Sequence, residues 1–202
     1  NKNFYNKELF SKKIVFEIIG LSNKEKQKLI KDLTDKNYKN IFNLSKEKLS
    51  SDVNKNNLVL DFSAKKNYPS KINITINKVT KVGKIYKNKK LFLIGSNGKL
   101  INYDINQKID LPYFYGNFNR DQFLEFLTLI NKIGLDKKDI SSFYLFPSGR
   151  WDILFKNELL VKLPKKDVNN ALLKLLFLRN NQSFKSLKII DLRIKNRVIT
   201  NG

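Results

Sequence analysis

Residues 186–200, at the end of the chain, read S-L-K-I-I-D-L-R-I-K-N-R-V-I-T. At a period of two residues the side chains of this stretch separate into two sets. One set is apolar and consists of Ile190, Leu192, Ile194 and Val198. The other set is charged and consists of Asp191, Arg193, Lys195 and Arg197. The alternation predicts one half-buried β-strand with its charged side in solvent.

This predicted strand ends two residues before Gly202, so we expect no later segment to pair with its free edge. A free edge offers unpaired N–H and C=O groups to another chain, and native edges are commonly blunted by charges such as these. Two interpretations stay open. The strand either closes the sheet as a charged edge, or it is a docking edge to which a partner adds a strand.

Upstream of this strand, the pattern from Gly83 onward is one of many short strands and two helices. Strands are predicted at residues 84–86, 91–94, 100–103 and 140–146, a hairpin at 151–155 and 159–163, and helices at 119–133 and 167–178, the second capped by Asp167. Trp151 alternates with Ile153 and Phe155, which favours a core position for this single Trp. Residues 83–200 are predicted to form a curved, mainly antiparallel sheet with two helices on one face.

Residues 14–82 predict a smaller domain of order β-α-α-β-β. A β-branched strand over 14–19 ends at Gly20, and Ser22 with Glu25 forms the sequence pattern of a capping box. A second helix follows Ser45, and strands are predicted at 58–65 and 71–79. Residues 1–13 are polar and basic and are expected to be a lead-in. The fold class predicted for the whole chain is α+β.

The charge of the chain is strongly positive, with 40 Lys and Arg against 18 acidic residues and a formal charge of +22. Such a balance normally indicates a nucleic acid or another anionic partner. Nearly all of these cations are Lys, however, and Asn and Ile are also abundant, which is typical of an A/T-rich genome. Arg-rich clusters, a Gly-rich phosphate loop and an aromatic RNA-binding strand are all missing from the sequence. Nucleic-acid binding therefore stays as the alternative function.

The residue types argue against an enzyme. The chain has no Cys and no His, which excludes thiol and imidazole nucleophiles, Ser-His-Asp triads and the common zinc ligand sets. Asp104 and Asp110 are a conceivable carboxylate pair, but they flank a loop without a convergent motif. We expect no enzymatic activity, no cofactor and no metal. The chain begins with Asn1 and has no Met, so we also expect a preceding segment.

Both predicted domains contain short motifs in a defined order. In the first domain these are the strand before Gly20, the Pro69 turn and the strand Ile72-Asn-Ile-Thr-Ile76. In the second they are Ile94-Gly-Ser-Asn-Gly98, Leu111-Pro112 with Gly116, Gly149-Arg-Trp151 and Asp191-Leu-Arg193. Together, these motifs resemble the extracytoplasmic part of the bacterial cell-division proteins FtsQ and DivIB. The chain departs from the family pattern at Lys78-Val-Thr-Lys81, where an acidic residue and a Pro are usual, and at Gly95, where Asp is usual.

The resemblance implies a POTRA domain over residues 14–82 and an FtsQ-type β domain over 83–200. It implies a non-enzymatic scaffold of the division machinery, held in the inner membrane by one upstream transmembrane helix, with this region in the periplasm or extracytoplasmic space. The implied partners are the small division proteins FtsB and FtsL, with further division proteins on the POTRA domain. A POTRA-bearing translocation or outer-membrane assembly factor is a second alternative, which a single POTRA unit disfavours.

The resemblance also implies a partner-binding site at the final strand. The positions that match it are Asp191, Leu192, Arg193, Ile194, Asn196 and Val198, with Arg150 and Trp151 in the preceding hairpin. A partner strand would add to this edge, and Arg150 and Arg193 are expected to clamp a carboxylate on it. The period-two pattern predicts that Arg193→Ala leaves the fold intact, and that Ile194→Asp weakens binding and endangers the fold.

Overall fold

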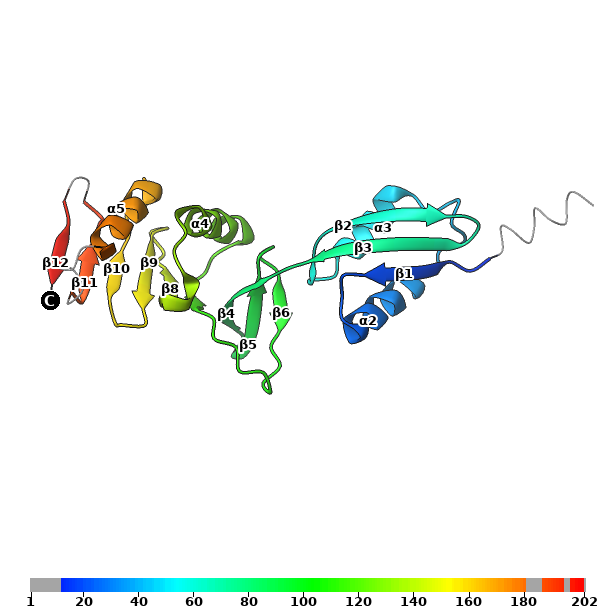
Figure 1. Cartoon of the computed structure of the whole chain (residues 1–202), viewed down its shortest axis with the longest axis horizontal. Coiled ribbons are helices and arrows are strands. Elements are labelled where there is room, and N and C mark those ends of the chain that lie inside the picture. Colours follow the sequence, from blue (N-terminus) through cyan, green and yellow to red (C-terminus); the bar gives the residue numbers. More distant parts are fainter. Residues whose placement is uncertain (1–11, 181–186, 195–196, 202) are drawn as a thin grey trace, which may run out of the picture. The chain divides into compact units, whose positions relative to one another are not determined.

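The computed structural model describes residues 12–180, 187–194 and 197–201, which divide into two compact units (Figure 1). The division falls between Val79 and Thr80, and not between residues 82 and 83 as expected. The reason is that Lys81–Lys87 forms one continuous strand of the second unit's sheet.

The first unit has the predicted order β-α-α-β-β. Its elements are β1 (Val15–Ile19), α2 (Asn23–Thr34), α3 (Lys46–Asn54), β2 (Val59–Asn67) and β3 (Lys71–Lys78). Strand β3 lies in the middle, parallel to β1 and antiparallel to β2. Its alternate residues Ile72, Ile74 and Ile76 are buried in one core with side chains of both helices. The predicted α+β fold is confirmed here.

Local hydrogen bonds mark the helix starts that the sequence predicts. The backbone N–H of Ser22 donates to a carboxylate oxygen of Glu25 at 3.0 Å, the reciprocal half of a capping box. Ser45 accepts a hydrogen bond from the backbone N–H of Lys48 at 3.1 Å and so caps α3.

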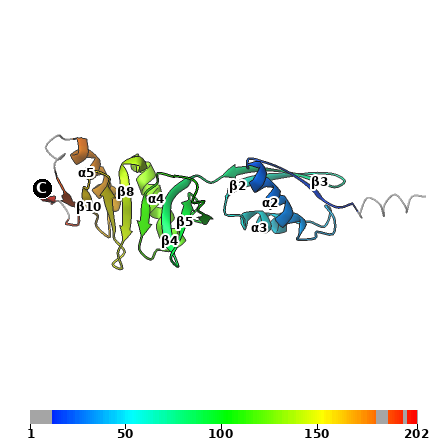
Figure 2. The same cartoon turned by 90° about the horizontal axis from the view of Figure 1, so that it is seen from below.

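The second unit is a mixed sheet with helices on one face (Figures 1 and 2). Its elements are β4 (Lys81–Lys87), β5 (Lys90–Gly95), β6 (Leu100–Asn102), β7 (Tyr113–Tyr115), α4 (Arg120–Ile133), a 3-10 turn (Lys137–Asp139), β8 (Ile140–Leu145), β9 (Trp151–Phe155), β10 (Leu160–Lys162), α5 (Val168–Asn180), β11 (Ile189–Asp191) and β12 (Ile199–Asn201). The strand order is β12-β11-β10-β9-β8-β7-β4-β5-β6. Most pairings are antiparallel, as predicted, and β4–β7, β7–β8 and β10–β11 are parallel.

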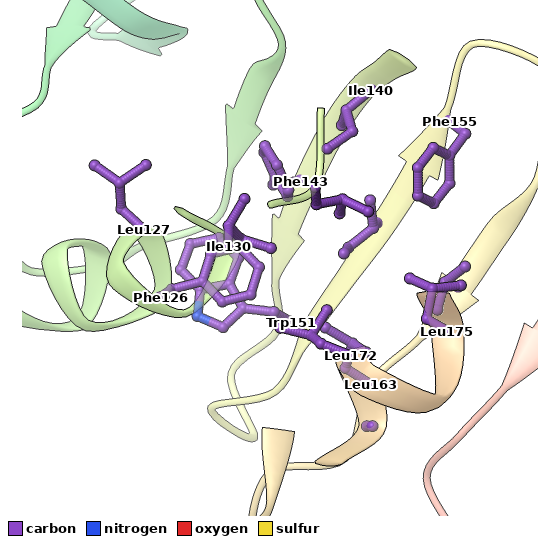
Figure 3. Packing of buried hydrophobic residues seen from close by; sticks show 14 of the residues in the cluster. Phe126, Leu127, Ile130, Ile140, Phe143, Trp151, Phe155, Leu163, Leu172 and Leu175 are labelled. Carbon is purple, nitrogen blue, oxygen red and sulfur yellow. The ribbon is translucent and has the colours of Figure 1, made fainter. Parts of the chain in front are cut away.

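An aromatic cluster forms the centre of this unit's core (Figure 3). The indole of Trp151 stacks on the ring of Phe126 from α4, with centroids 4.3 Å apart and planes 8° apart. Phe143 from β8 meets Phe126 edge-on at 5.4 Å. Trp151 is only 6% exposed, so this side chain holds α4 against the sheet and is core, as its alternation with Ile153 and Phe155 predicts.

Strand β7 has no counterpart among the predicted strands. Its three residues lie between Pro112 and Gly116, and so short a segment carries no alternation that identifies a strand. Gly116 has φ +109°, and a Cβ there would collide with the carbonyl oxygen of Leu145. Only Gly therefore permits this close approach of the chain to β8.

Candidate functional site

The terminal segment forms two strands where the sequence predicts one. β11 ends at Asp191, and the chain returns as β12, which pairs antiparallel with β11 in the register Asp191↔Ile199 and Ile189↔Asn201. The predicted continuous strand over 186–200 is wrong, and so is the expectation that no later segment covers its edge. Among the described strands of this sheet, β12 and β6 are the two outer ones, and β12 presents the free edge at the end that holds the terminal segment.

The side chain of Asp191 causes this break. Its Oδ1 accepts a hydrogen bond from the backbone N–H of Arg193 at 3.0 Å, which is an Asx turn. The N–H of Leu192 still donates to the carbonyl of Lys162 at 2.9 Å, so pairing with β10 ends at that residue. A period-two pattern continues through such a turn and therefore does not reveal it.

Asp191 and Arg193 form a compact ion pair. The guanidinium donates from Nη2 to Asp191 Oδ2 at 2.6 Å and from Nε at 2.9 Å. The hydrogen bond from Arg193 holds the pKa of the Asp191 carboxyl below its usual range, against the opposing effect of burial. Asp191 lies on the opposite side of the strand from the core residue Ile190, as predicted, but it is 8% exposed, so its predicted exposure to solvent is wrong: the ion-paired carboxylate is tolerated in a buried position.

A second pair of the same spacing lies two strands away. The Nε of Arg150 donates to Asp152 Oδ1 at 3.1 Å, and its guanidinium lies 4.2 Å from the ring centroid of Phe146. Asp152 is only 2% exposed. Each arginine of the expected clamp is thus bonded to a carboxylate two residues away on its own chain. Arg has five donors, so a partner carboxylate would use those outside these pairs.

The remaining positions of the expected site lie in different environments. Leu192 is buried, in agreement with its place in the apolar set. Ile194 and Val198 are 48% and 38% exposed, so their predicted burial is wrong, because the turn after Asp191 takes them off the strand. Trp151 lies in the core and offers a partner little surface. Asn196 lies outside the described residues.

Beside this segment lies a groove of about 830 Å³ between α5 and the chain that follows β11. Leu173 and Ile194, each about half exposed, are its apolar side chains at the surface. Its basic side chains are Lys165, Lys166, Lys174 and Arg193, and Asp167 is the one acidic residue that lines it. Such a groove fits an amphipathic segment that carries carboxylates.

Sequence reasoning missed the α5 side of this groove. The helix was expected to be amphipathic, but Leu173 and Phe177, one turn apart, are 49% and 74% exposed. The available signal was the run Leu172-Leu-Lys-Leu-Leu-Phe-Leu178, which holds more apolar residues than one buried face needs. Asp167, the expected cap of α5, has a left-handed φ of +61°. Its Oδ1 accepts a hydrogen bond from the side-chain amide of Asn170.

Within residues 12–180, 187–194 and 197–201, no three potential acidic ligands converge as a metal site would require. Over the same residues, no helix has the length and apolarity needed to cross a bilayer.

Two family models match the chain in the order of its units. The model "POTRA domain, FtsQ-type" matches residues 15–78, and "Cell division protein FtsQ/DivIB, C-terminal" matches residues 85–193, more than half of the chain. The chain belongs to the FtsQ/DivIB family. The first unit is therefore its POTRA domain and the second its β domain. The β-domain match ends at Arg193, so β12 lies beyond it.

A comparison with solved structures finds the major extracytoplasmic domain of the cell-division protein DivIB from Geobacillus stearothermophilus. The match has 14% sequence identity and a TM-score of 0.36, and it covers 48% of this chain and 87% of the other. No curated protein matches the sequence. The FtsQ/DivIB family is a family of non-enzymatic cell-division proteins, and membership of it indicates a role for the chain in cell division.

Proposed function

We propose that this FtsQ/DivIB chain is a non-enzymatic scaffold that gathers small division proteins of the FtsB and FtsL type. In this proposal a preceding transmembrane helix anchors it in the inner membrane, and the described units lie outside the cytoplasm. A partner strand adds to the free edge of β12, and a flanking segment of the same partner occupies the groove beside α5. The POTRA domain binds other division proteins.

The free edge of β12 lies beside a groove with apolar and basic walls, and this arrangement supports the proposal. The edge supplies backbone hydrogen bonds of about 0.5 to 1.5 kcal/mol net each. Leu173 and Ile194 supply apolar contact, and Lys174 and Arg193 supply charge for a carboxylate. Together these contributions reach about 8 kcal/mol, the free energy of a micromolar complex.

The test is a calorimetric titration of the chain with the extracytoplasmic segment of the FtsB-like protein of the same organism. We expect micromolar or tighter binding at physiological salt, and loss of most of it in Leu173→Asp. Leu60→Asp is the matched control, because Leu60 is 48% exposed and lies in the POTRA domain. If Leu173→Asp and the parent chain bind the FtsB-like segment with equal affinity, the groove is not part of the interface.

Nucleic-acid binding is the competing function because of the +22 charge. A random DNA duplex titrated in parallel separates the two. Tight binding that falls steeply with salt, together with no binding of the FtsB-like segment, would assign the charge to nucleic acid and overturn the scaffold proposal.

A further inference from the structure

The sheet of the β domain has a second face, opposite α4 and α5. The helix side carries Phe143, Ile153 and Val161, which belong to the buried core. The intervening residues point the other way, and the strand register aligns them in two rows. The first row is Lys84, Tyr113, Ser142, Leu154, Leu160 and Ile189, and the second is Tyr115, Tyr144, Asp152, Lys162 and Asp191. Among the described elements, no helix packs on this face (Figures 1 and 2).

Four tyrosines on this face form a continuous stack, which we call the tyrosine row: Tyr86, Tyr113, Tyr115 and Tyr144. Successive ring centroids lie 6.1, 5.9 and 5.1 Å apart, with nearly parallel planes. Tyr86 and Tyr115 are 55% and 40% exposed. The ammonium of Lys84 lies 4.1 Å from the ring centroid of Tyr113. The face therefore offers ring edges, phenol hydroxyls and a cation in one line.

The charge available on this face is positive. Its two carboxylates, Asp152 and Asp191, are buried and bonded to arginines. Lys84 and Lys162 are partly exposed cations on this face, and Lys84 also interacts with the charge of Asp110. A second copy of the chain would bring another +22 charge against the same face, which opposes self-association. An acidic partner is attracted instead.

We propose that the tyrosine row is the docking surface for an amphipathic α-helix with acidic flanks, supplied by another protein. Side chains at i and i+4 of a helix are about 5–6 Å apart, and the ring spacing of 5.1 to 6.1 Å matches this repeat. Apolar side chains of the helix contact the rings, and its carboxylates pair with Lys84 and Lys162. Tyrosine is among the residues enriched at the cores of interfaces. The surface is separate from the β12 edge and does not rest on the function proposed there.

The experiment uses a fluorescently labelled synthetic 20-residue helix with Leu at every third or fourth position and Glu on both flanks. Its anisotropy is followed during titration with the whole chain at physiological salt. We expect the Glu helix to bind and a counterpart with Lys in place of Glu not to bind. Tyr115→Ala and Tyr86→Ala should each weaken binding about tenfold or more, as for central interface aromatics.

The matched control is Tyr68→Ala, because Tyr68 is 60% exposed but lies in the POTRA domain. Its affinity should equal that of the parent. Fluorescence of the buried Trp151 verifies that each variant is folded. If Tyr115→Ala does not fold, Tyr86→Ala carries the test, since its ring is the more exposed.

Three results would overturn the proposal. One is failure of the Glu helix to bind at any soluble concentration. Another is equal affinity of the Glu helix for the parent and for folded Tyr86→Ala and Tyr115→Ala. This would mean that the helix is bound non-specifically, by the net positive charge alone. The third is a dimer in sedimentation velocity that Tyr115→Ala abolishes, which would assign the face to a second copy of the chain.

Discussion

The centre and the terminal edge of the β-domain sheet are held together in different ways. At the centre, Trp151 of β9 stacks on Phe126 of α4, so residues distant in the chain fix each other. At the edge, Asp191 is fixed by Arg193, two residues further on. One sheet thus combines a part that is set by long-range packing with a part that is set by local hydrogen bonds. Of these two parts, the edge is the one that leaves backbone hydrogen-bonding groups open to a partner strand.

The largest effect is expected where the packing is long-range. Trp151→Ala removes the ring on which Phe126 stacks and should destabilise the β domain by about 3–5 kcal/mol. Urea unfolding followed by circular dichroism measures the loss, with Trp151→Phe as the control that keeps an aromatic ring there. A loss below about 1 kcal/mol would contradict the view that this stack fixes the centre.

At the edge a smaller loss is expected from Arg193→Ala. The structure revises the expectation that this change leaves the fold intact, because the buried Asp191 carboxylate loses its guanidinium. We expect a lower unfolding midpoint, with a smaller loss than in Trp151→Ala, because the Arg193 side of the pair is in contact with solvent. Arg197→Ala is the matched control, since Arg197 is exposed. Equal unfolding midpoints for the two variants would mean that the pair contributes nothing.

The same pair predicts a dependence on acid. The folded-state pKa of Asp191 is lowered, so its stabilising contribution is complete above the unfolded value of about 3.9 and is lost as pH falls through the folded value. The parent should therefore be more stable than Asp191→Asn at pH 6, with the difference shrinking below about pH 4. Melting temperatures at a series of pH values measure this. A constant difference down to pH 2 would contradict it.

The smallest effect on folding is expected from Ile194→Asp. Ile194 is 48% exposed beyond the turn, so the change should alter stability by no more than about 0.5 kcal/mol. Affinity for the FtsB-like segment should nevertheless fall, because the residue lines the groove. Calorimetry and urea unfolding of the same sample separate the two. If the variant is markedly less stable but its folded fraction binds normally, Ile194 acts as a core residue and not as a contact residue.

The sequence predicts those strands and helices whose apolar residues repeat with the period of the element that they form. Strand β3 and helix α4 were found because their buried residues repeat at two and about 3.6 positions. Strand β7 was missed because three residues carry no period. The turn at Asp191 was missed because alternation does not show which groups neutralise a carboxylate. The groove was missed because it needs α5 and the terminal segment to meet, which no local pattern encodes.

Strands β10 and β11 are parallel neighbours, and the chain between them includes α5. The hairpin β9–β10, by contrast, closes over four residues, 156–159. Closing the longer connection costs more chain entropy, so β11 and β12 are expected to join the sheet late in folding, after α5 has packed. A nascent or partly folded chain would then lack the free edge altogether. Recruitment of a partner through β12 would consequently be restricted to molecules that have finished folding.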